Sequence, residues 1–239
     1  MLEKETDYTS RFTGTLRNGL TAYYPFNHDL ANAVDPKEKA TLHGATLSPQ
    51  GWVDVNGSSV EYPDPLKVET GTFTASLNVY EANLTDTAGG AYLQAGEGAT
   101  ATGLISHNWV GRSEDWEGSG YGKAGGDGSG TRFPQDLETI RGKWVNYVIV
   151  SGNGAYRLFR NGVELKSVLY DKGKEVSGKA AQRVYTVSGK WNSGREWWMT
   201  GSGGMVYTER IVGRFDDFTV FNRAISDVEV HQLYHALKK

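Results

Sequence analysis

The last strand-like stretch, residues 211–237 (IVGRFDDFTVFNRAISDVEVHQLYHAL), constrains the fold of this chain more than any other. Its first half alternates with the period of a β-strand. Phe218 and Val220 are therefore expected on one face of the strand, and Thr219 and Phe221 on the other. Two acids, Asp216 and Asp217, are adjacent at the start of this strand.

A helix is predicted directly after this strand, with its own start signal. The hydroxyl of Ser226 can accept a hydrogen bond from the N–H of Glu229, while the Glu229 carboxylate reaches back to the Ser226 N–H. Beyond this capping box, apolar residues recur on one helical face, namely Val230, Leu233, Tyr234 and Leu237. The chain is thus expected to close with a strand, a short break and an amphipathic helix.

Residues 72–80 alternate apolar and polar side chains and predict a strand of a two-layer sandwich. The apolar face of this strand consists of Phe73, Ala75, Leu77 and Val79. The polar face, with Thr74, Ser76 and Asn78, is expected to be half-exposed. Residues 144–150 (WVNYVIV), in contrast, are apolar or aromatic except for Asn146 and predict a fully buried strand.

Two Asn-Gly pairs predict tight type I′ turns between strands. The pair at 161–162 predicts a hairpin in which Leu158 faces Leu165 across the two strands. The pair at 56–57 gives the same signal within residues 51–62. Turns of this kind, together with 31 glycines in the chain, are typical of a β-rich fold.

This closing pattern resembles that of laminin-G-like, or concanavalin A-like, jelly-roll domains. Such domains end with an acid-acid-hydrophobic strand, an aromatic-Asn-Arg-Ala-Leu turn and a helix that finishes in Leu-Tyr. The stretch DDFTVFNRAISDVEVHQLY matches this order, with Ile225 in place of the usual Leu. Residues 19–34, 52–63 and 142–165 resemble earlier strands of the family, also in order. The resemblance implies an all-β fold, a two-sheet antiparallel jelly-roll sandwich (concanavalin A-like) with a short C-terminal helix.

The length of 239 residues is compatible with one domain or two. All recognisable segments belong to one architecture, so we predict a single jelly-roll domain over residues 15–239. Residues 1–14 are predicted to be a linker or an artificial N-terminal extension, since they are charged and carry no signal peptide. The resemblance implies an extracellular or cell-surface location, as one module of a longer protein.

Composition excludes several classes of function. The net charge of −3 provides no electrostatic attraction to nucleic acid or to an anionic membrane. An apolar run of 18 residues is absent from the sequence, so no membrane-inserted helix is predicted. The absence of cysteine excludes disulfides, thiolate metal sites and a cysteine nucleophile.

A structural calcium ion is the cofactor that the resemblance implies, because many jelly rolls of this kind bind Ca²⁺ at the edge of the sandwich. Asp216 is predicted to share the inward face of Phe218, where a carboxylate needs either hydrogen bonds or a cation. A polar loop at 27–35 offers the hard oxygen ligands that Ca²⁺ prefers. The predicted metal ligands are Asn27, Asp29, Asp35 and Asp216.

Two aromatic-rich insertions, the first at residues 109–127 and the second at residues 191–198, predict a sugar-binding surface. Aromatic rings stack on the apolar faces of sugars, and planar polar groups hydrogen-bond to the hydroxyls. Several of these tryptophans could instead fill the core. The predicted ligand-binding residues are Trp109, Arg112, Asp115, Trp116, Tyr121, Trp191, Arg195, Trp197 and Trp198.

We therefore expect a non-catalytic module that binds a glycan or polysaccharide and is stabilised by calcium. A polysaccharide lyase or glycoside hydrolase on the same fold is one alternative, and a protein-interaction or adhesion module without a sugar site is another. The acids of residues 113–118 (SEDWEG) do not have the E-x-D-x-x-E spacing that hydrolases of this fold use. His107 and Tyr121 could act as a base–acid pair, but no catalytic residues are predicted.

Overall fold

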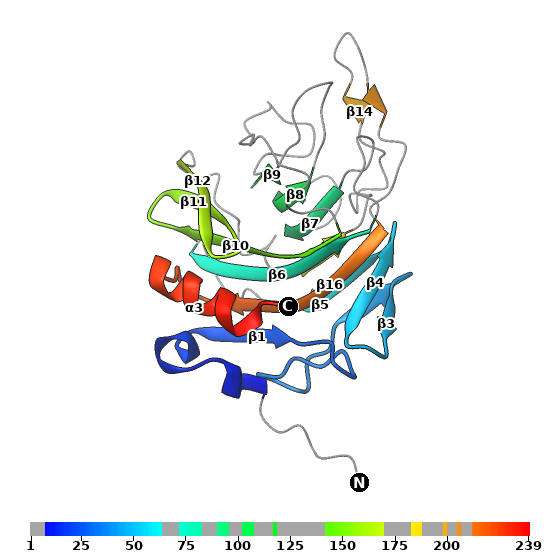
Figure 1. Ribbon diagram of the computed structural model, residues 1–239, viewed down its shortest axis with the longest axis horizontal. Coiled ribbons are helices and arrows are strands. Elements are labelled where there is room, and N and C mark those ends of the chain that lie inside the picture. Colours follow the sequence, from blue (N-terminus) through cyan, green and yellow to red (C-terminus); the bar gives the residue numbers. More distant parts are fainter. Residues whose placement is uncertain are drawn as a thin grey trace.

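The computed structural model describes residues 8–63, 72–82, 90–95, 102–107, 117–118, 142–169, 183–187, 198–199, 205–206 and 212–239. In these ranges the chain forms a two-sheet antiparallel jelly-roll sandwich with one short α-helix near its C-terminus, as predicted (Figure 1). None of the described helices is long and apolar enough to cross a membrane.

The larger sheet has eight strands in the order β12-β11-β10-β6-β16-β4-β3, and β1 also pairs with β16. Strand β16 therefore lies in the middle of the sheet, where its first half pairs with β4 and its second half with β1. The bounds of these strands are β1 Leu20–Tyr24, β3 Thr46–Ser48, β4 Trp52–Asn56, β6 Phe73–Glu81, β10 Trp144–Gly152, β11 Ala155–Arg160, β12 Val163–Leu169 and β16 Val212–Phe221.

The second sheet has six strands in the order β2-β5-β13-β7-β8-β9. Its strands are β2 Thr41–His43, β5 Ser59–Pro63, β7 Gly90–Ala95, β8 Thr102–His107, β9 Glu117–Gly118 and β13 Arg183–Val187. A separate pair joins β14 (Trp198–Met199) to β15 (Met205–Val206). The helical segments are the 3-10 turns η1 (Tyr8–Arg11) and η2 (Gly14–Arg17) and the helix α3 (Asp227–Leu237).

The inner core lies between the two sheets. Strand β6 contributes its alternating apolar residues to this core, as predicted from residues 72–80, and β16 contributes Phe218 and Val220. Tyr62 of the second sheet packs on Phe218 with ring centroids 4.0 Å apart. Burial of these side chains is the main force that holds the two sheets together.

An outer core covers part of the opposite face of the large sheet. There α3 and the N-terminal turns lie over the strands, as Figure 1 shows for α3 and β1. The polar face of β6, with Thr74, Ser76 and Asn78, is consequently buried. The prediction that this face is half-exposed is wrong, because the helix adds a third layer to the sandwich. The members of the outer core are Phe12, Leu16, Tyr23, Val148, Val150, Phe159, Phe221, Ile225, Val230, Leu233 and Leu237.

The described part of the predicted N-terminal linker packs against this outer core. The side chain of Phe12 is fully buried and meets the ring of Tyr23 edge-on, with centroids 4.9 Å apart. Arg223, just after β16, accounts for the tight connection between the two ends of the domain. Its guanidinium donates to the backbone carbonyls of Asn18 and Thr15 and to the carboxylate of Glu229.

The helix start was predicted correctly, whereas two turn predictions were wrong in detail. Ser226 and Glu229 form the capping box before α3. The Asn-Gly turn at 161–162 has positive φ at both residues, as a type I′ turn requires, but a bulge pairs Leu158 with Lys166 rather than Leu165. The turn at 56–57 connects β4 to β5, which belong to different sheets, so it forms a corner of the sandwich and not a hairpin.

Candidate functional site

Strand β16 carries a β-bulge at Asp217, and this bulge decides where its two acids lie. The backbone of Asp217 has a φ of +51°, and the pairing with β6 shifts register at this point. Phe215 and Phe218 therefore both enter the inner core, while Asp216 and Asp217 both lie on the outer face of the sheet. The prediction that Asp216 shares the face of Phe218 and Val220 is wrong, because the alternation does not continue across a bulge.

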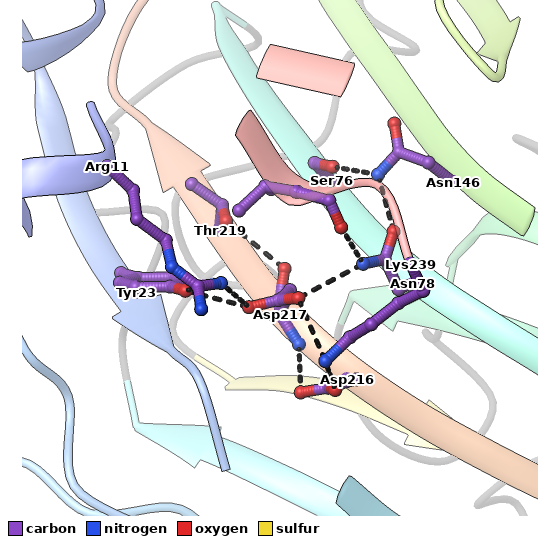
Figure 2. A network of polar contacts seen from close by, with 10 residues as sticks. Arg11, Tyr23, Ser76, Asn78, Asn146, Asp216, Asp217, Thr219 and Lys239 are labelled. Atoms are coloured by element: carbon purple, nitrogen blue, oxygen red, sulfur yellow. Dashed lines mark hydrogen bonds and ion pairs between the residues drawn. The ribbon is translucent and has the colours of Figure 1, made fainter. Parts of the chain in front are cut away.

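Asp217 lies at the centre of a buried polar network beneath the end of α3 (Figure 2). Its side chain is 1% exposed. One carboxylate oxygen accepts a hydrogen bond from the Tyr23 hydroxyl at 2.7 Å, and the other accepts one from the Asn78 amide at 3.1 Å. Arg11 lies 3.6 Å from the first oxygen. The network thus connects the N-terminal turn, β1, β6 and β16.

Asp216 is fully buried beside Asp217 and takes its positive partner from Lys239. The Nζ atom of Lys239 lies 2.5 Å from Oδ2 of Asp216 and 3.7 Å from Oδ2 of Asp217. Burial, followed by the neighbouring Asp217 carboxylate, raises the pKa of Asp216 to about 7, although Lys239 acts in the opposite direction. The two acids therefore share one ammonium group in a site that disfavours a second negative charge.

The predicted calcium ligands are distributed over two places in the structure. In the loop after β1, Asp29 and Asp35 each accept a backbone N–H, from Ala31 and Lys37 respectively. Asn27, at the start of this loop, packs against Gly51. Across the described ranges, no three acidic or histidine side chains lie close enough together to hold a metal ion, so Asp216 does not join the two loop acids in such a group.

A second surface was not predicted from the sequence. The outer face of the large sheet that α3 leaves uncovered carries five partly exposed side chains, which we call the open face: Trp52, Asp54, Tyr80, Trp144 and Arg214. Four of them form one row across neighbouring strands, because Trp144 pairs with Tyr80, Tyr80 with Arg214, and Arg214 with Asp54. Side chains at paired positions of adjacent strands lie on the same face of a sheet and contact one another.

The rings of the open face form one aromatic cluster around a cation. The ring centroid of Trp144 lies 5.7 Å from that of Tyr80 and 6.1 Å from that of Trp52. The guanidinium carbon of Arg214 lies 4.7 Å from the centroid of the Trp52 ring and 4.9 Å from that of Tyr80. The indole N–H of Trp52 donates to Asp54 at 3.1 Å. Strands hold all five residues, so the surface is preorganised.

Lys239 connects the open face to the acid network. Its ammonium, besides its contacts with the two acids, lies 5.8 Å from the ring centroid of Trp144. The last residues of the chain thus cross the outer face at the boundary between the covered and the uncovered halves of the sheet. In Figure 1 the C-terminus lies in front of the large sheet, close to the end of α3.

Local alternation could have indicated that these side chains face outward. Val53 and Val55 point into the inner core, which places Trp52 and Asp54 on the other side of β4. The same argument places Arg214 opposite Phe215. The sequence carries no comparable signal that β10, β6, β16 and β4 are neighbours, and that order is what assembles the cluster.

Nearly all the ligand-binding residues predicted from the two insertions lie outside the described residues. These are Trp109, Arg112, Asp115, Trp116, Tyr121, Trp191, Arg195 and Trp197. Trp198 belongs to β14, where it pairs with Val206 of β15. The prediction that the insertions bind sugar therefore stays a prediction.

A small cavity at the edge of the inner core contains a buried acid. It is lined by Val79, Glu81, Tyr92, Lys143, Val145 and Tyr147. The hydroxyl of Tyr92 donates to the Glu81 carboxylate at 2.5 Å. Glycosidases use two carboxyl groups that flank the scissile bond, whereas the lining of this cavity supplies only that of Glu81.

Comparison with known proteins identifies the class of fold. No model of a protein family matches the chain, and no curated protein matches its sequence. Domain 4 of AbnA, a GH43 extracellular arabinanase from Geobacillus stearothermophilus solved with arabinotriose, is similar over 90% of this chain and 98% of that domain, with a TM-score of 0.58 and 20% identity.

Two larger proteins match over part of their length. A structure of botulinum neurotoxin type C, whose cell entry depends on two ganglioside molecules, has a TM-score of 0.64, with 11% identity over 92% of this chain. Trypanosoma rangeli sialidase has a TM-score of 0.57, with 15% identity over 90% of this chain. The chain spans 52% of the toxin structure and 32% of the sialidase. These likenesses show a β-sandwich fold that is shared with sugar-binding and glycosidase-related proteins.

Proposed function

We propose that this chain is a non-catalytic glycan-binding module and that the open face is part of its binding surface. The observation that carries this proposal is the cluster of three partly exposed rings, Trp52, Tyr80 and Trp144, beside a guanidinium and a carboxylate. Aromatic rings bind the apolar faces of sugars, and the adjacent charged groups can bind the hydroxyls. A rigid sheet holds these groups in place before the ligand arrives, which lowers the entropic cost of binding.

The similar proteins support the same class of ligand. The arabinanase domain was solved with a bound arabinose oligomer, and the toxin interacts with gangliosides, which are glycolipids. That arabinanase is extracellular, and we propose an extracellular or cell-surface location for this chain as well. Within a larger protein, such a module would keep its parent attached to a glycan-bearing surface. The two aromatic insertions are proposed to extend the binding surface.

Replacing Trp52 and Trp144 together by Ala is expected to weaken glycan binding at least about tenfold, since each stacked ring contributes about 1 kcal/mol. A broad glycan array identifies a ligand for the unmodified protein, and titration calorimetry then compares the dissociation constants. Both tryptophans are partly exposed, so thermal unfolding should show a domain that is still folded.

A comparison variant replaces Trp197 and Trp198 in the second insertion by Ala. A loss of binding in this variant, with none in the Trp52, Trp144 variant, would place the binding site in the insertion and not on the open face. A blank array for the unmodified protein, both in calcium and in EDTA, would refute the glycan proposal and favour a protein partner.

The calcium ion predicted from the sequence stays a prediction, and we propose the loop after β1 as its place. Lys239 already neutralises charge at Asp216, so the ligands would be Asn27, Asp29 and Asp35 together with backbone carbonyls. Calcium at a hundredfold excess over its Kd is expected to raise the free energy of unfolding by about 3 kcal/mol relative to EDTA. Thermal unfolding of the protein and of an Asp29→Asn, Asp35→Asn variant measures this effect. Equal melting temperatures of the unmodified protein with calcium and with EDTA would refute the calcium proposal.

A further inference from the structure

The donors of Arg214 are largely unused, and this observation leads beyond the proposed function. A guanidinium carries five N–H donors in a planar fork and is always charged. The Nε atom of Arg214 lies 3.5 Å from Asp54, a distance that makes an ion pair but a poor hydrogen bond. Within the part of the chain that the structure describes, the side chain of Arg214 makes no hydrogen bond. Its side chain is 38% exposed, so its donors are open to a ligand.

Ring contacts and an ion pair, rather than hydrogen bonds, hold the guanidinium of Arg214 in position. The rings of Trp52 and Tyr80 both contact it, at 4.7 and 4.9 Å from its central carbon. Asp54 lies on its Nε side and is itself held by the indole N–H of Trp52. The two Nη groups are therefore left for a ligand, and a planar carboxylate can accept hydrogen bonds from such a group in pairs.

The chemistry of the open face favours an acceptor-rich, negatively charged ligand. Its fixed polar groups are one guanidinium and one carboxylate, and that carboxylate already accepts from Trp52. The ammonium of Lys239 lies over the Trp144 ring but is already paired with Asp216, so Arg214 is the cation of this face that is open to a ligand. A neutral sugar would use the rings but would leave the charged fork of Arg214 without an anionic acceptor.

We propose that the open face selects glycans that carry a carboxylate, with Arg214 binding the carboxylate while Trp52, Tyr80 and Trp144 contact the sugar rings. This inference rests on the proposed glycan-binding function and specifies its ligand class. Uronic acids and sialic acids both supply this chemistry, and the test separates the two sources.

The experiment compares ligands that differ only in the acid group. Trigalacturonic acid is titrated beside its methyl ester, and sialyllactose beside the methyl ester of its sialic acid carboxylate, at low and at high salt. We expect at least one of the acids to bind about tenfold more tightly than its neutral counterpart at low salt, with a smaller difference at high salt. A preference for trigalacturonic acid would identify uronic acids as the ligand class, and a preference for sialyllactose would identify sialic acids. Arg214→Gln should remove the preference, and Arg214→Lys should retain part of it, because lysine keeps the charge but not the fork.

Arg157→Gln serves as the matched control and should leave the preference unchanged, because Arg157 lies outside the open face and its guanidinium is already paired with Glu164 and Asp227. Thermal unfolding verifies that the variants are folded. Equal binding of acidic and neutral ligands by the unmodified protein would overturn this inference while the glycan-binding function stands. A preference that survives Arg214→Gln, or is lost in Arg157→Gln alone, would overturn the role of Arg214. Failure to bind any glycan would instead refute the proposed function itself.

Discussion

Asp217→Ala is expected to lower the free energy of unfolding by about 3 kcal/mol, because the substitution leaves buried donors without an acceptor. Tyr23 and Asn78 both donate to the Asp217 carboxylate, and neither side chain reaches solvent. The new alanine would also have to adopt the positive φ of the bulge, which is strained for a residue with a Cβ and no polar side chain. Relief of the repulsion between Asp216 and Asp217 offsets part of this cost.

Urea unfolding with an unchanged m-value measures this loss. Asp217→Asn is the matched control, since asparagine tolerates positive φ and keeps one oxygen for the Tyr23 hydroxyl. We expect this control to lose about half as much stability as the alanine variant. A loss below about 1 kcal/mol for Asp217→Ala would mean that the network does not contribute to stability as the geometry indicates.

Asp216→Asn is expected to remove a fall in stability that the unmodified protein shows as the pH rises from about 4 to about 7. Burial and the Asp217 carboxylate raise the pKa of Asp216 to about 7 in the folded protein, against an ordinary value of 3.8. Between these two values the folded state keeps a proton that the unfolded state releases. The stabilisation is therefore complete below the unfolded pKa and is lost as the pH rises through the folded pKa.

The measurement is the difference in unfolding free energy between the unmodified protein and Asp216→Asn, followed from pH 4 to pH 8. Taking the difference cancels the titration of distant groups, and the charged groups that act on Asp216 are Asp217, Lys239 and, at longer range, Arg11. We expect the difference to fall by about 2 kcal/mol over this range, since each pKa unit corresponds to at most about 1.4 kcal/mol. A constant difference would show that Lys239 keeps Asp216 ionised throughout.

Glu229 contributes a pH dependence of the opposite sign in a separate window. Hydrogen bonds from Arg223 lower the pKa of Glu229 to about 2. Its stabilisation is present above the unfolded pKa of about 4.5 and is lost only as the pH falls through the folded value. The two acids therefore act in ranges that meet near pH 4 to 4.5, and the profile of Asp216→Asn above pH 5 is free of the Glu229 effect.

Much of the fold could be predicted from local patterns. Regular alternation in residues 72–80 placed Phe73 and its neighbours in the inner core, and Ser226 with Glu229 marked the start of α3. The same reasoning failed at Asp217, because a bulge changes the period without changing the composition of the strand. The sequence signal for this bulge is the Asp216-Asp217 pair, because aspartate tolerates positive φ better than most residues.

The open face could not be predicted because it depends on distant pairing. Trp52, Tyr80, Trp144 and Arg214 come from strands spread over more than half of the chain, and only the sheet order brings them together. The aromatic residues that stand out in the sequence are those that lie close together along the chain, in the two insertions. A row of residues across a sheet is not visible in that way, because each strand contributes just one or two members.

The central place of β16 has a consequence for the order in which the protein can form. This strand comes last among the strands, yet it lies between β6 on one side and β4 and β1 on the other. Until residues 212–221 have left the ribosome, the facing edges of β6 and β4 have no partner, and such edges invite pairing with other chains. The domain is therefore expected to complete its large sheet only after β16 has been synthesised, and a chain that stops before β16 is expected to aggregate rather than to fold in part.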